Sequence, residues 1–520
     1  MKIKKLIKVL GLKNNQIRLL NDFEVKGVSC NSKQVGDSFI FVAINGAQAD
    51  GRKFIEEAIK RGAKLIISQA VDRRPQTTDR RPQTTDRRPQ TTDRRPQTVD
   101  HRPQTVDRRP QTVDFIVVKD ARVALGKLAA QFYGNPAEKI KVVGVTGTNG
   151  KTTITYLIEA ILKKARLSPA VIGTINHRFK NKVFASKNTT PGPLDIQSMF
   201  AQMLECKVTH CAVEVSSHAL DQDRVQAIDF NSAIFTNLTQ DHLDYHKTIN
   251  NYFKSKLKLF SNLNKKSFAI LNIDDKYGRR IIKNTKAKII TYSIDSDADF
   301  KAEDIRSSCL GLEFSLKSKH RKINIKSSLI GRHNVYNILA AVSWARAQKI
   351  SLGLIKSAIL NFRNVPGRLE KVGSGKLSIF VDYAHTEDAL KNVLKSLRPL
   401  TKNKIIVVFG CGGDRDKLKR PKMGKIVTEL ADYAIITNDN PRSEEPMEII
   451  KDIKAGIRRN NYCVIPKRDD AIRKSLNLAS SGDVVLVAGK GHETYQILKN
   501  ETIHFDDRKV IKQCLKSLKF

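Results

Sequence analysis

Short apolar runs alternate with helical patterns along most of this chain, and that alternation limits the folds open to it. The run 141–145 precedes a segment whose apolar residues at 154, 157, 158, 161 and 162 share one face of a helix. Similar runs lie at 63–67, 115–118, 211–215, 232–235, 379–381, 405–409, 434–437 and 484–487. Short buried strands interleaved with helices are typical of parallel sheets covered by helices, so the sequence predicts an α/β fold.

The chain length predicts three domains. At about 100–200 residues per domain, 520 residues suffice for three separate cores. The motif Val365-Pro-Gly-Arg368 interrupts the chain just before a new series of strands begins. We therefore expect an N-terminal domain at 1–121, a central domain at 122–365 and a C-terminal domain at 366–520.

Six heptads of the type Asp-Arg-Arg-Pro-Gln-Thr-Thr occupy residues 72–113. A proline in every heptad, and the lack of apolar a and d positions, exclude a coiled coil. Because strand-like runs flank the tract, we interpret it as an expanded loop inserted within the N-terminal domain. An Arg-rich tether for phosphate-bearing partners remains the alternative.

The net charge of +41 points to an anionic partner but does not choose among nucleic acid, a membrane surface and an anionic substrate. The heptads hold eleven Arg and six Asp, so most of this basicity lies outside them. Seven scattered cysteines without a Cys-x-x-Cys pair argue against a disulfide framework and favour the cytoplasm. No apolar run approaches the ~20 residues of a membrane span, and lysines interrupt the N-terminal apolar stretch.

A glycine-rich segment, Gly144-Val-Thr-Gly-Thr-Asn-Gly-Lys-Thr-Thr153, lies between a predicted strand and its helix. Glycines allow backbone N–H groups to face phosphate oxygens, and the helix N-terminus adds the positive end of its dipole. Lys151 is placed to reach the β- and γ-phosphates, and the Thr152 hydroxyl to bind Mg²⁺. The segment predicts a nucleoside triphosphate site.

Acidic and imidazole side chains follow the next predicted strands, in Glu214-Val-Ser-Ser-His218 and Asp241-His-Leu-Asp-Tyr-His246. The carboxyl ends of parallel strands beside a phosphate loop are where Mg²⁺ ligands are expected. Each motif alone would also suit a helix cap or a polar loop, and their shared position favours the metal role.

Together these residues resemble the Mur ligase family, the ATP-dependent amide ligases of peptidoglycan precursor synthesis. The resemblance covers the chain apart from the heptads. Besides the three motifs above, it rests on Asn188-Thr-Thr-Pro191, Asp382-Tyr-Ala-His-Thr386, Gly410-Cys-Gly-Gly-Asp-Arg-Asp416, Asp439-Asn-Pro-Arg442 and Gly489-Lys-Gly-His-Glu493. It implies an N-terminal UDP-binding α/β domain, a central P-loop ATPase-like domain with a mainly parallel sheet, and a C-terminal Rossmann-like domain.

The resemblance also implies an activity. It is that of the family member that adds the third amino acid, meso-diaminopimelate, to the D-Glu of UDP-MurNAc-L-Ala-D-Glu. ATP would phosphorylate the D-Glu carboxylate, and the incoming amine would then attack the acyl phosphate. Such an acid–amino acid ligase, forming ADP and phosphate, would serve cell wall biogenesis, cell shape and cell division.

The site residues that the resemblance implies fall into four sets. For ATP they are Gly147, Thr148, Asn149, Gly150, Lys151, Thr152, Thr153, Asn337 near adenine, Arg368 near the phosphates and Asp382 at the ribose. For Mg²⁺, expected as two ions, they are Thr152, Glu214, His242 and Lys256, the last as a carbamate. For the UDP-linked substrate they are Ser32, Asn188, Thr189, Thr190, Ser216, Gln222 and Arg224. For diaminopimelate they are Arg415, Asp439, Asn440, Pro441, Arg442, Gly489 and Glu493.

Arg442 is the residue from which we infer the choice of amine. Its planar guanidinium can bind a carboxylate with two hydrogen bonds, and meso-diaminopimelate carries a distal carboxylate that L-lysine lacks. Glu493 suits the distal ammonium of the same amino acid.

Three alternatives remain open at this point. They are a lysine-adding ligase, a folylpolyglutamate synthase and, in another class, a basic nucleic-acid-binding protein with a vestigial ATP site. We favour the addition of meso-diaminopimelate, by a protein that acts as a monomer without nucleic-acid partners or membrane insertion.

Overall fold

The computed structural model describes residues 1–46, 49–70, 113–308, 311–319, 321–373 and 377–517. The chain forms two compact units, Met1–Phe132 and Tyr133–Phe520. Nearly all of the heptad tract, residues 72–112, lies outside the described residues. Within the described part, no helix is long and apolar enough to cross a membrane.

The first unit is built on a four-stranded parallel sheet in the order β1-β2-β3-β4. Its core includes Phe41 and Ile66 on the strands and Ala58 on a helix. The two strands predicted on either side of the heptads are confirmed as β3 and β4. They are neighbours in the sheet, because Leu65 of β3 pairs with Asp114 of β4. The strands are β1 (Gly27–Ser29), β2 (Phe39–Ala43), β3 (Ala63–Gln69) and β4 (Asp114–Val118), and the helices are α1 (Ile3–Leu6), α2 (Asn14–Arg18), α3 (Ile55–Lys60) and α4 (Ala121–Phe132).

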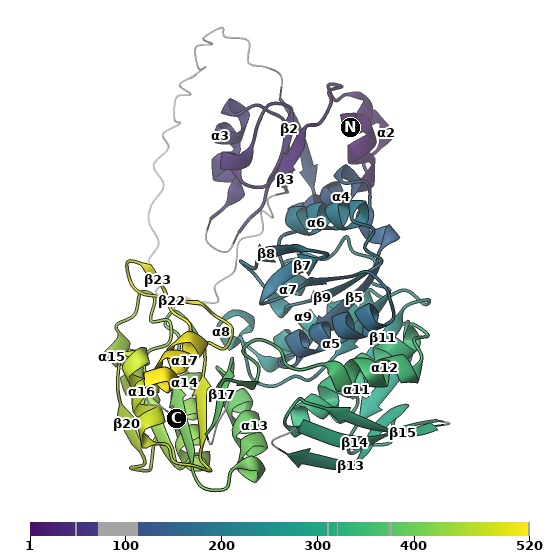
Figure 1. Cartoon of the computed structure of the whole chain (residues 1–520). Helices are drawn as coiled ribbons and strands as arrows, with labels where there is room; N and C mark the ends of the chain where they lie inside the picture. Colours follow the sequence, from purple (N-terminus) through teal and green to yellow (C-terminus); the bar gives the residue numbers. More distant parts are fainter. Residues whose placement is uncertain (47–48, 71–112, 309–310, 320, 374–376, 518–520) are drawn as a thin grey trace, which may run out of the picture. The chain divides into compact units, whose positions relative to one another are not determined.

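The second unit contains two large sheets (Figure 1). In its described residues, the larger sheet has the order β15-β14-β13-β12-β11-β10-β5-β9-β6-β7-β8. The strands are β5 (Lys141–Thr146), β6 (Pro169–Ile172), β7 (Asn176–Phe179), β8 (Lys182–Ala185), β9 (His210–Glu214), β10 (Ser232–Phe235), β11 (Phe268–Asn272), β12 (Lys288–Ser293), β13 (Phe300–Ser308), β14 (Gly311–Ser318) and β15 (Arg321–Ser327). Pairing is parallel from β6 through β13 and antiparallel beyond both ends of that run.

Helices cover both faces of this sheet. One face packs on α5, α11 and α12 through Leu157, Leu339 and Ile355. The other packs on α6, α9 and α10, which supply residues such as Phe200 and Phe253. The helices are α5 (Lys151–Lys164), α6 (Pro193–Glu205), α7 (Ser217–Asp221), α8 (Leu243–His246), α9 (Ile249–Ser261), α10 (Lys276–Ile282), α11 (Arg332–Ala347) and α12 (Leu352–Asn361).

The second sheet has the order β16-β17-β21-β18-β19-β20 and is parallel except at β16. Helices α13, α14 and α15 pack on one face, and α16 and α17 on the other. Its strands are β16 (Glu370–Lys371), β17 (Ser378–Asp382), β18 (Ile405–Phe409), β19 (Tyr433–Ile436), β20 (Tyr462–Val464) and β21 (Val484–Ala488), and β22 (Tyr495–Ile497) pairs with β23 (Thr502–His504). The helices are α13 (Glu387–Leu397), α14 (Lys419–Leu430), α15 (Pro446–Lys454), α16 (Arg468–Leu478) and α17 (Asp507–Ser517).

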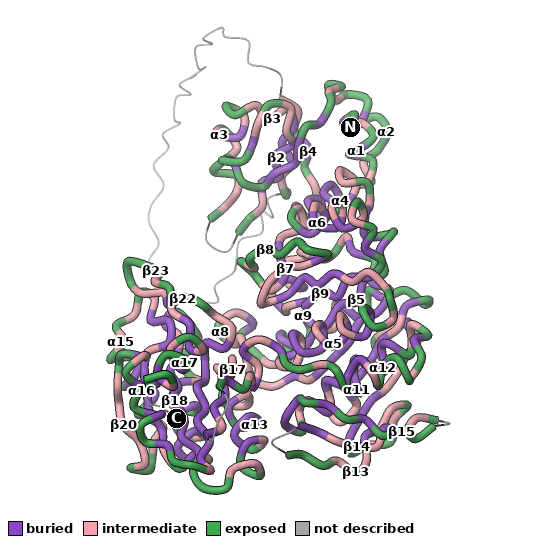
Figure 2. Tube along the Cα trace, in the orientation of Figure 1, coloured by how far each residue is buried: buried purple, intermediate pink, exposed green. Residues whose placement is uncertain are grey.

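The predicted α/β class with mainly parallel sheets is confirmed. Apart from the exposed Lys141 at the start of β5, the central strands β5, β9, β18 and β21 are buried, as the apolar runs required (Figure 2). The antiparallel strands β7–β8 and β13–β15 were not predicted, because they are not continuous buried runs; β8, for example, is wholly exposed and β13 mostly exposed or half-buried. The domain boundaries at 121/122 and 365/366 stay a prediction.

Candidate active site

The glycine-rich loop joins the buried strand β5 to helix α5. Gly147 has a φ of +148° and Gly150 a φ of +90°, backbone angles that residues other than glycine rarely adopt. A Cβ on Gly147 would lie 1.8 Å from Thr236 Oγ1, and one on Gly150 would lie 2.4 Å from Asn337 Oδ1. The loop therefore needs both glycines, and Asn337 lies directly against it.

Lys151 begins helix α5 and folds back over this loop. Its Nζ donates hydrogen bonds to the carbonyl oxygens of Gly147 at 2.9 Å and Thr148 at 2.8 Å. The ammonium group is thus held on the side of the loop where backbone N–H groups and the helix N-terminus attract anions. This arrangement suits the phosphates of a nucleotide.

Thr152 and Glu214 bring together the kinds of oxygen that Mg²⁺ prefers. The Thr152 hydroxyl donates to Glu214 Oε2 at 2.9 Å, and Glu214 is only 1% exposed at the end of β9. Thr174 donates to the same carboxylate through its backbone N–H at 3.0 Å and its hydroxyl at 2.9 Å. No cluster of three or more His, Cys, Asp or Glu among the described residues forms a metal site. Thr152 and Glu214 could therefore bind a hard cation such as Mg²⁺ only together with ligands other than a cluster of these four residue types.

Lys256 is a buried lysine at the same place. It lies on α9, is 1% exposed, and its Nζ donates to the carbonyl oxygen of Gly147 at 2.9 Å. The Nζ also lies 4.4 Å from the centre of the Tyr252 ring. Burial, followed by the charge of Lys151, lowers the pKa of Lys256 well below its usual value. It makes no ion pair within the described ranges of the chain.

His242 faces the same region from the loop before α8. Its backbone is left-handed, with a φ of +54°, and its Nε2 lies 3.4 Å from Asp241 Oδ2. Exclusion of water lowers the pKa of His242 to about 3, against the opposing effect of Asp241. A neutral imidazole is the form that binds metals.

The residues predicted to bind the UDP-linked substrate lie largely around the carboxyl end of β9. The Thr190 hydroxyl donates to the Glu214 carbonyl oxygen at 2.7 Å and accepts from the Ser216 N–H at 3.0 Å. Arg224 donates to the Thr190 carbonyl oxygen at 2.9 Å and to Gln222 Oε1 at 2.6 Å. The Thr189 and Thr174 hydroxyls form a hydrogen bond at 3.0 Å, and the exposed Asn188 directly precedes Thr189. Ser32 belongs to the first unit, where its hydroxyl donates to Glu57 at 2.7 Å.

Arg368 reaches the phosphate loop from the segment before β16. Its Nη2 donates to the Thr152 hydroxyl at 3.3 Å, while its buried Nε has no hydrogen-bond partner. An unpaired buried N–H of this kind costs free energy, which a phosphate oxygen would recover. The carboxylate of Asp382, at the end of β17, accepts hydrogen bonds from the backbone N–H groups of Leu369 at 2.6 Å and Ala384 at 2.7 Å.

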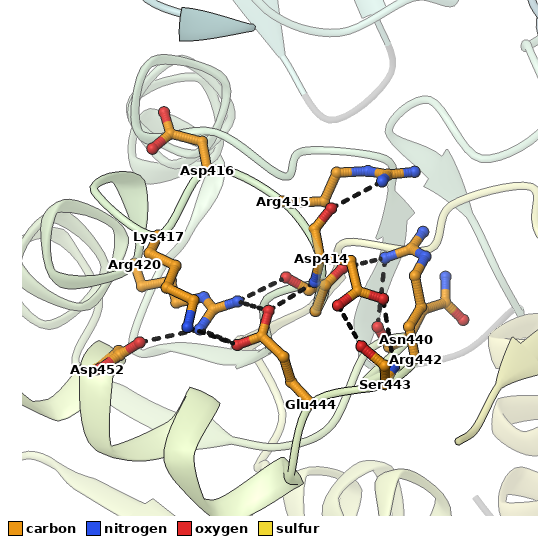
Figure 3. Close-up of polar contacts among 12 residues, drawn as sticks. Asp414, Arg415, Asp416, Lys417, Arg420, Asn440, Arg442, Ser443, Glu444 and Asp452 are labelled. Atoms are coloured by element: carbon orange, nitrogen blue, oxygen red, sulfur yellow. Dashed lines mark hydrogen bonds and ion pairs between the residues drawn. The ribbon is translucent and has the colours of Figure 1, made fainter. Parts of the chain in front are cut away.

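Two facing loops carry most of the predicted amino-acid site (Figure 3). Arg415 lies in the loop after β18, and Arg442 in the loop after β19. The Arg442 guanidinium donates to the carbonyl oxygens of Gly413 at 2.8 Å and Asn440 at 3.4 Å. Its pKa is lowered by burial and then by the nearby charge of Arg415. Neither arginine makes an ion pair with any described carboxylate, so together they favour an anionic ligand.

The structure adds Lys490 to this site, a residue to which the sequence analysis gave no role. Lys490 is fully buried, and its Nζ donates to Asn440 Oδ1 and Glu493 Oε2, each at 3.0 Å. Asn440 Nδ2 also donates to Glu493 Oε2, at 2.9 Å. The Glu493 carboxylate is therefore held by a cation and an amide. Lys490 lies inside the motif Gly489-Lys-Gly-His-Glu493, which was the available signal.

The other predicted residues flank these loops. Gly489 has a φ of +112°, and a Cβ there would lie 2.5 Å from Asp439 Oδ2. The Pro441 carbonyl oxygen lies 1.8 Å from the position that a Cβ on Gly413 would take. The close packing explains why glycines stand at these places.

Comparisons with known proteins match this architecture in three successive parts. The family descriptions are "Mur ligase family, catalytic domain" for residues 24–133, "Mur ligase middle domain" for 145–345 and "Mur ligase, glutamate ligase domain" for 367–491. The chain therefore belongs to the Mur ligase family, and its three-domain α/β organisation is confirmed.

Within that family the chain is similar to proteins named UDP-N-acetylmuramoyl-L-alanyl-D-glutamate--2,6-diaminopimelate ligase. The relative from Clostridium tetani is 43% identical, with 100% of both chains covered. The relative from Clostridium botulinum is 42% identical over 96% of each chain. A solved structure with the same name aligns over 100% of both chains at 29% identity, with a TM-score of 0.67.

Proposed function

We propose that this chain is the ATP-dependent ligase that joins meso-diaminopimelate to the D-Glu of UDP-MurNAc-L-Ala-D-Glu in peptidoglycan synthesis, forming ADP and phosphate. The full-length relatives carry the name of that reaction. The observation in the structure that carries the proposal is the pair Arg415 and Arg442, two guanidinium groups on facing loops without a described carboxylate partner.

The phosphate loop would bind and align ATP. Backbone N–H groups of 147–153 and the Lys151 ammonium would hold the phosphates, and Arg368 would add its free Nε. Asn337 would lie near the adenine and Asp382 at the ribose. Phosphoryl transfer depends on alignment and charge neutralisation, which is what these groups supply.

Mg²⁺ would be held by Thr152, Glu214, His242 and a carbamate on Lys256, as two ions. The hydroxyl, the carboxylate and the neutral imidazole are suitable donors, and the lowered pKa of Lys256 favours the uncharged amine that reacts with CO₂. When bound, the metal would neutralise the charge that develops on the transferred phosphoryl group.

The substrate residues would place the D-Glu carboxylate beside this centre. Within the second unit, the residues that would hold the UDP-linked peptide are Asn188, Thr189, Thr190, Ser216, Gln222 and Arg224. The role of Ser32, in the first unit, stays a prediction from the sequence. A carboxylate oxygen would attack the γ-phosphorus and release ADP. The amine of the amino acid would then attack the acyl carbon, phosphate would leave, and the nitrogen would lose a proton as the amide forms.

The distal end of the amino acid would be recognised by charge. Arg442 and Arg415 would bind the carboxylate that L-lysine lacks. Glu493, held by Lys490 and Asn440, would accept from the distal ammonium. Asp439, Pro441 and Gly489 would shape the walls of this site.

The alternatives are less well supported. A lysine-adding ligase does not account for two arginines that lack a carboxylate partner among the described residues. The motifs matched to the UDP-linked substrate, such as Asn188-Thr-Thr-Pro191, weigh against a folylpolyglutamate synthase. A nucleic-acid-binding role for the heptads concerns residues that lie almost wholly outside the described ranges. The cytoplasmic location and the monomeric state expected from the sequence stay predictions.

A coupled assay of ADP release tests the proposal. Wild-type protein receives ATP, Mg²⁺ and the UDP-linked dipeptide with either meso-diaminopimelate or L-lysine. We expect turnover with diaminopimelate, its loss in Lys151→Ala, and wild-type activity in Lys163→Ala on the exposed side of the same helix. A higher kcat/KM for lysine, or ADP release that does not require the dipeptide, would refute the proposal.

A variant lacking residues 72–112 tests the nucleic-acid alternative. We expect this variant to keep its ligase activity. We also expect neither the full chain nor the variant to show salt-dependent binding of nucleic acid.

A further inference from the structure

Two loops form the amino-acid site, and they are bound to each other as well as to their strands. The Gly413 N–H donates to the Asn440 carbonyl oxygen at 2.9 Å. The Ser443 hydroxyl donates to Asp414 Oδ1 at 2.5 Å, and the Asp414 N–H donates to Glu444 Oε1 at 2.6 Å. A Cβ on Gly412 would lie 2.8 Å from Arg442 Nη1. The position of one loop therefore fixes the position of the other.

Both loops hold a side-chain-bearing residue in the left-handed region. Asp414 and Arg442 each have a φ of +53°. That conformation costs free energy for residues other than glycine, so it persists only where surrounding contacts enforce it. Gly412 and Glu444, each two residues from one of these positions, are both bound by the same buried side chain.

That side chain is Arg420, the second residue of α14. It is 0% exposed, and its guanidinium donates to both Glu444 oxygens, at 2.9 Å and 2.8 Å (Figure 3). It also donates to Asp452 Oδ2 on α15 at 2.9 Å and to the Gly412 carbonyl oxygen at 3.3 Å. Glu444 Oε1 accepts from Arg420 and from the Asp414 N–H together, so one carboxylate links α14 to both loops.

We propose that Arg420 is a positioning residue for amino-acid selection. By binding Glu444, Asp452 and Gly412, it holds the two loops at the separation at which Arg415 and Arg442 face one ligand carboxylate. The proposal rests on the function proposed above for Arg442. Arg420 itself makes its bonds to groups of the protein and is closed to solvent, so it acts through the two loops.

The test measures steady-state kinetics of Glu444→Gln and Arg420→Met. Glu444→Gln keeps the size of the side chain and leaves Arg420 paired with Asp452, whereas Arg420→Met leaves two carboxylates without their cation. Glu444→Gln therefore tests the proposal even if Arg420→Met does not fold. We expect the KM for diaminopimelate to rise about tenfold, while kcat and the KM values for ATP and the UDP-linked dipeptide stay within about twofold. The ratio of kcat/KM for diaminopimelate to that for L-lysine should fall by a similar factor.

The same domain offers matched controls. Arg398 donates to Asp432 Oδ2 at 2.9 Å on an exposed surface, and Asp432 also accepts the Ile405 N–H at 2.7 Å. Asp432→Asn and Arg398→Met therefore remove an arginine–carboxylate ion pair of the same domain that lies on an exposed surface away from the loops. We expect both to keep the wild-type KM for diaminopimelate, even where they lower the melting temperature.

Arg442→Ala separates the two proposals. If it leaves the KM for diaminopimelate unchanged, the proposed amino-acid site is wrong, and the role of Arg420 falls with it. If it raises that KM while Glu444→Gln leaves it unchanged, only the role of Arg420 is refuted. An equal loss of kcat with diaminopimelate and lysine, at constant KM, would likewise reduce Arg420 to a structural residue.

Discussion

The side-chain nitrogen of Lys256 lies 2.9 Å from the carbonyl oxygen of Gly147, the first glycine of the phosphate loop. A buried lysine thus contacts the loop proposed to bind ATP, at a point that Lys151 also contacts. Two ammonium groups at one carbonyl oxygen repel each other, which favours the uncharged form of the more buried amine.

The first prediction concerns a carbamate on Lys256. Because its pKa is lowered, the amine is available to react with CO₂ and so become an anion. Enzyme incubated with ¹³C-labelled bicarbonate should show a carbamate resonance in its NMR spectrum. The Lys256→Arg variant should lack this resonance, and its activity should fall by at least about a hundredfold. Lys258→Arg, on the same helix and paired with Asp223 at 3.7 Å, is the matched control and should keep both. A full carbamate signal in Lys256→Arg would contradict the assignment.

Removal of the Thr152 hydroxyl should raise the Mg²⁺ requirement. Thr152→Ala leaves Glu214 without one of its donors and removes a proposed ligand. We expect kcat to fall by about tenfold or more and half-maximal activity to need more Mg²⁺, whereas Thr152→Ser should stay near the wild type. The measurement is a Mg²⁺ titration of ADP release at saturating substrates. Identical titration curves for the alanine variant and the wild type would exclude Thr152 as a ligand.

Arg442→Ala should lower the preference for diaminopimelate over L-lysine. Loss of the guanidinium leaves the distal carboxylate of the substrate without its partner, so we expect kcat/KM for diaminopimelate to fall by about a hundredfold or more. Activity with lysine should change little. Arg459→Ala, an exposed arginine in the same domain that donates to the Glu429 carbonyl oxygen at 3.3 Å, should leave the preference intact.

Asp388 should matter for ATP use although it lies on α13. Its Oδ2 accepts from Asn149 Nδ2 at 3.0 Å and from the Thr239 hydroxyl at 3.2 Å. Hydrogen bonds to a charged acceptor are worth about 1.5–3 kcal/mol, so Asp388→Ala should lower kcat/KM for ATP by about tenfold or more. The neighbouring Glu387→Ala provides the control. An unchanged kcat/KM for ATP would show that this contact has no part in binding the nucleotide.

The ion pair of Glu444 should make the stability of the protein depend on pH. The hydrogen bonds from Arg420, followed by the Asp414 N–H, lower the pKa of Glu444 from 4.5 to about 2. A carboxylate with a lowered pKa in the folded state stabilises the protein fully above its unfolded pKa, and the effect is lost as the pH falls toward the folded value. The melting temperature of Glu444→Gln should therefore lie furthest below that of the wild type at pH 6–7. The gap should narrow below about pH 4.5, and a gap independent of pH would contradict this assignment.

The strands and the phosphate loop could be predicted from the sequence because their signals are local. Buried parallel strands such as β5, β18 and β21 are nearly continuous apolar runs in the sequence. The glycines within 144–153 indicate the turn between the strand and the helix. The strands β7 and β8, at one end of the larger sheet, could not be found in this way. All four residues of β8 are exposed, and β7 buries only His177 and Phe179, so neither strand is a continuous apolar run.

By itself, the sequence determined the α/β class, the place of the nucleotide loop and the family to which the chain belongs. The tertiary structure decided which groups the charged side chains contact. Arg420 binds Glu444 across 24 positions of the chain. Lys256 approaches Gly147 across 109 positions. Such pairs depend on where strands and helices meet in space, and neither residue type nor local spacing encodes that distance.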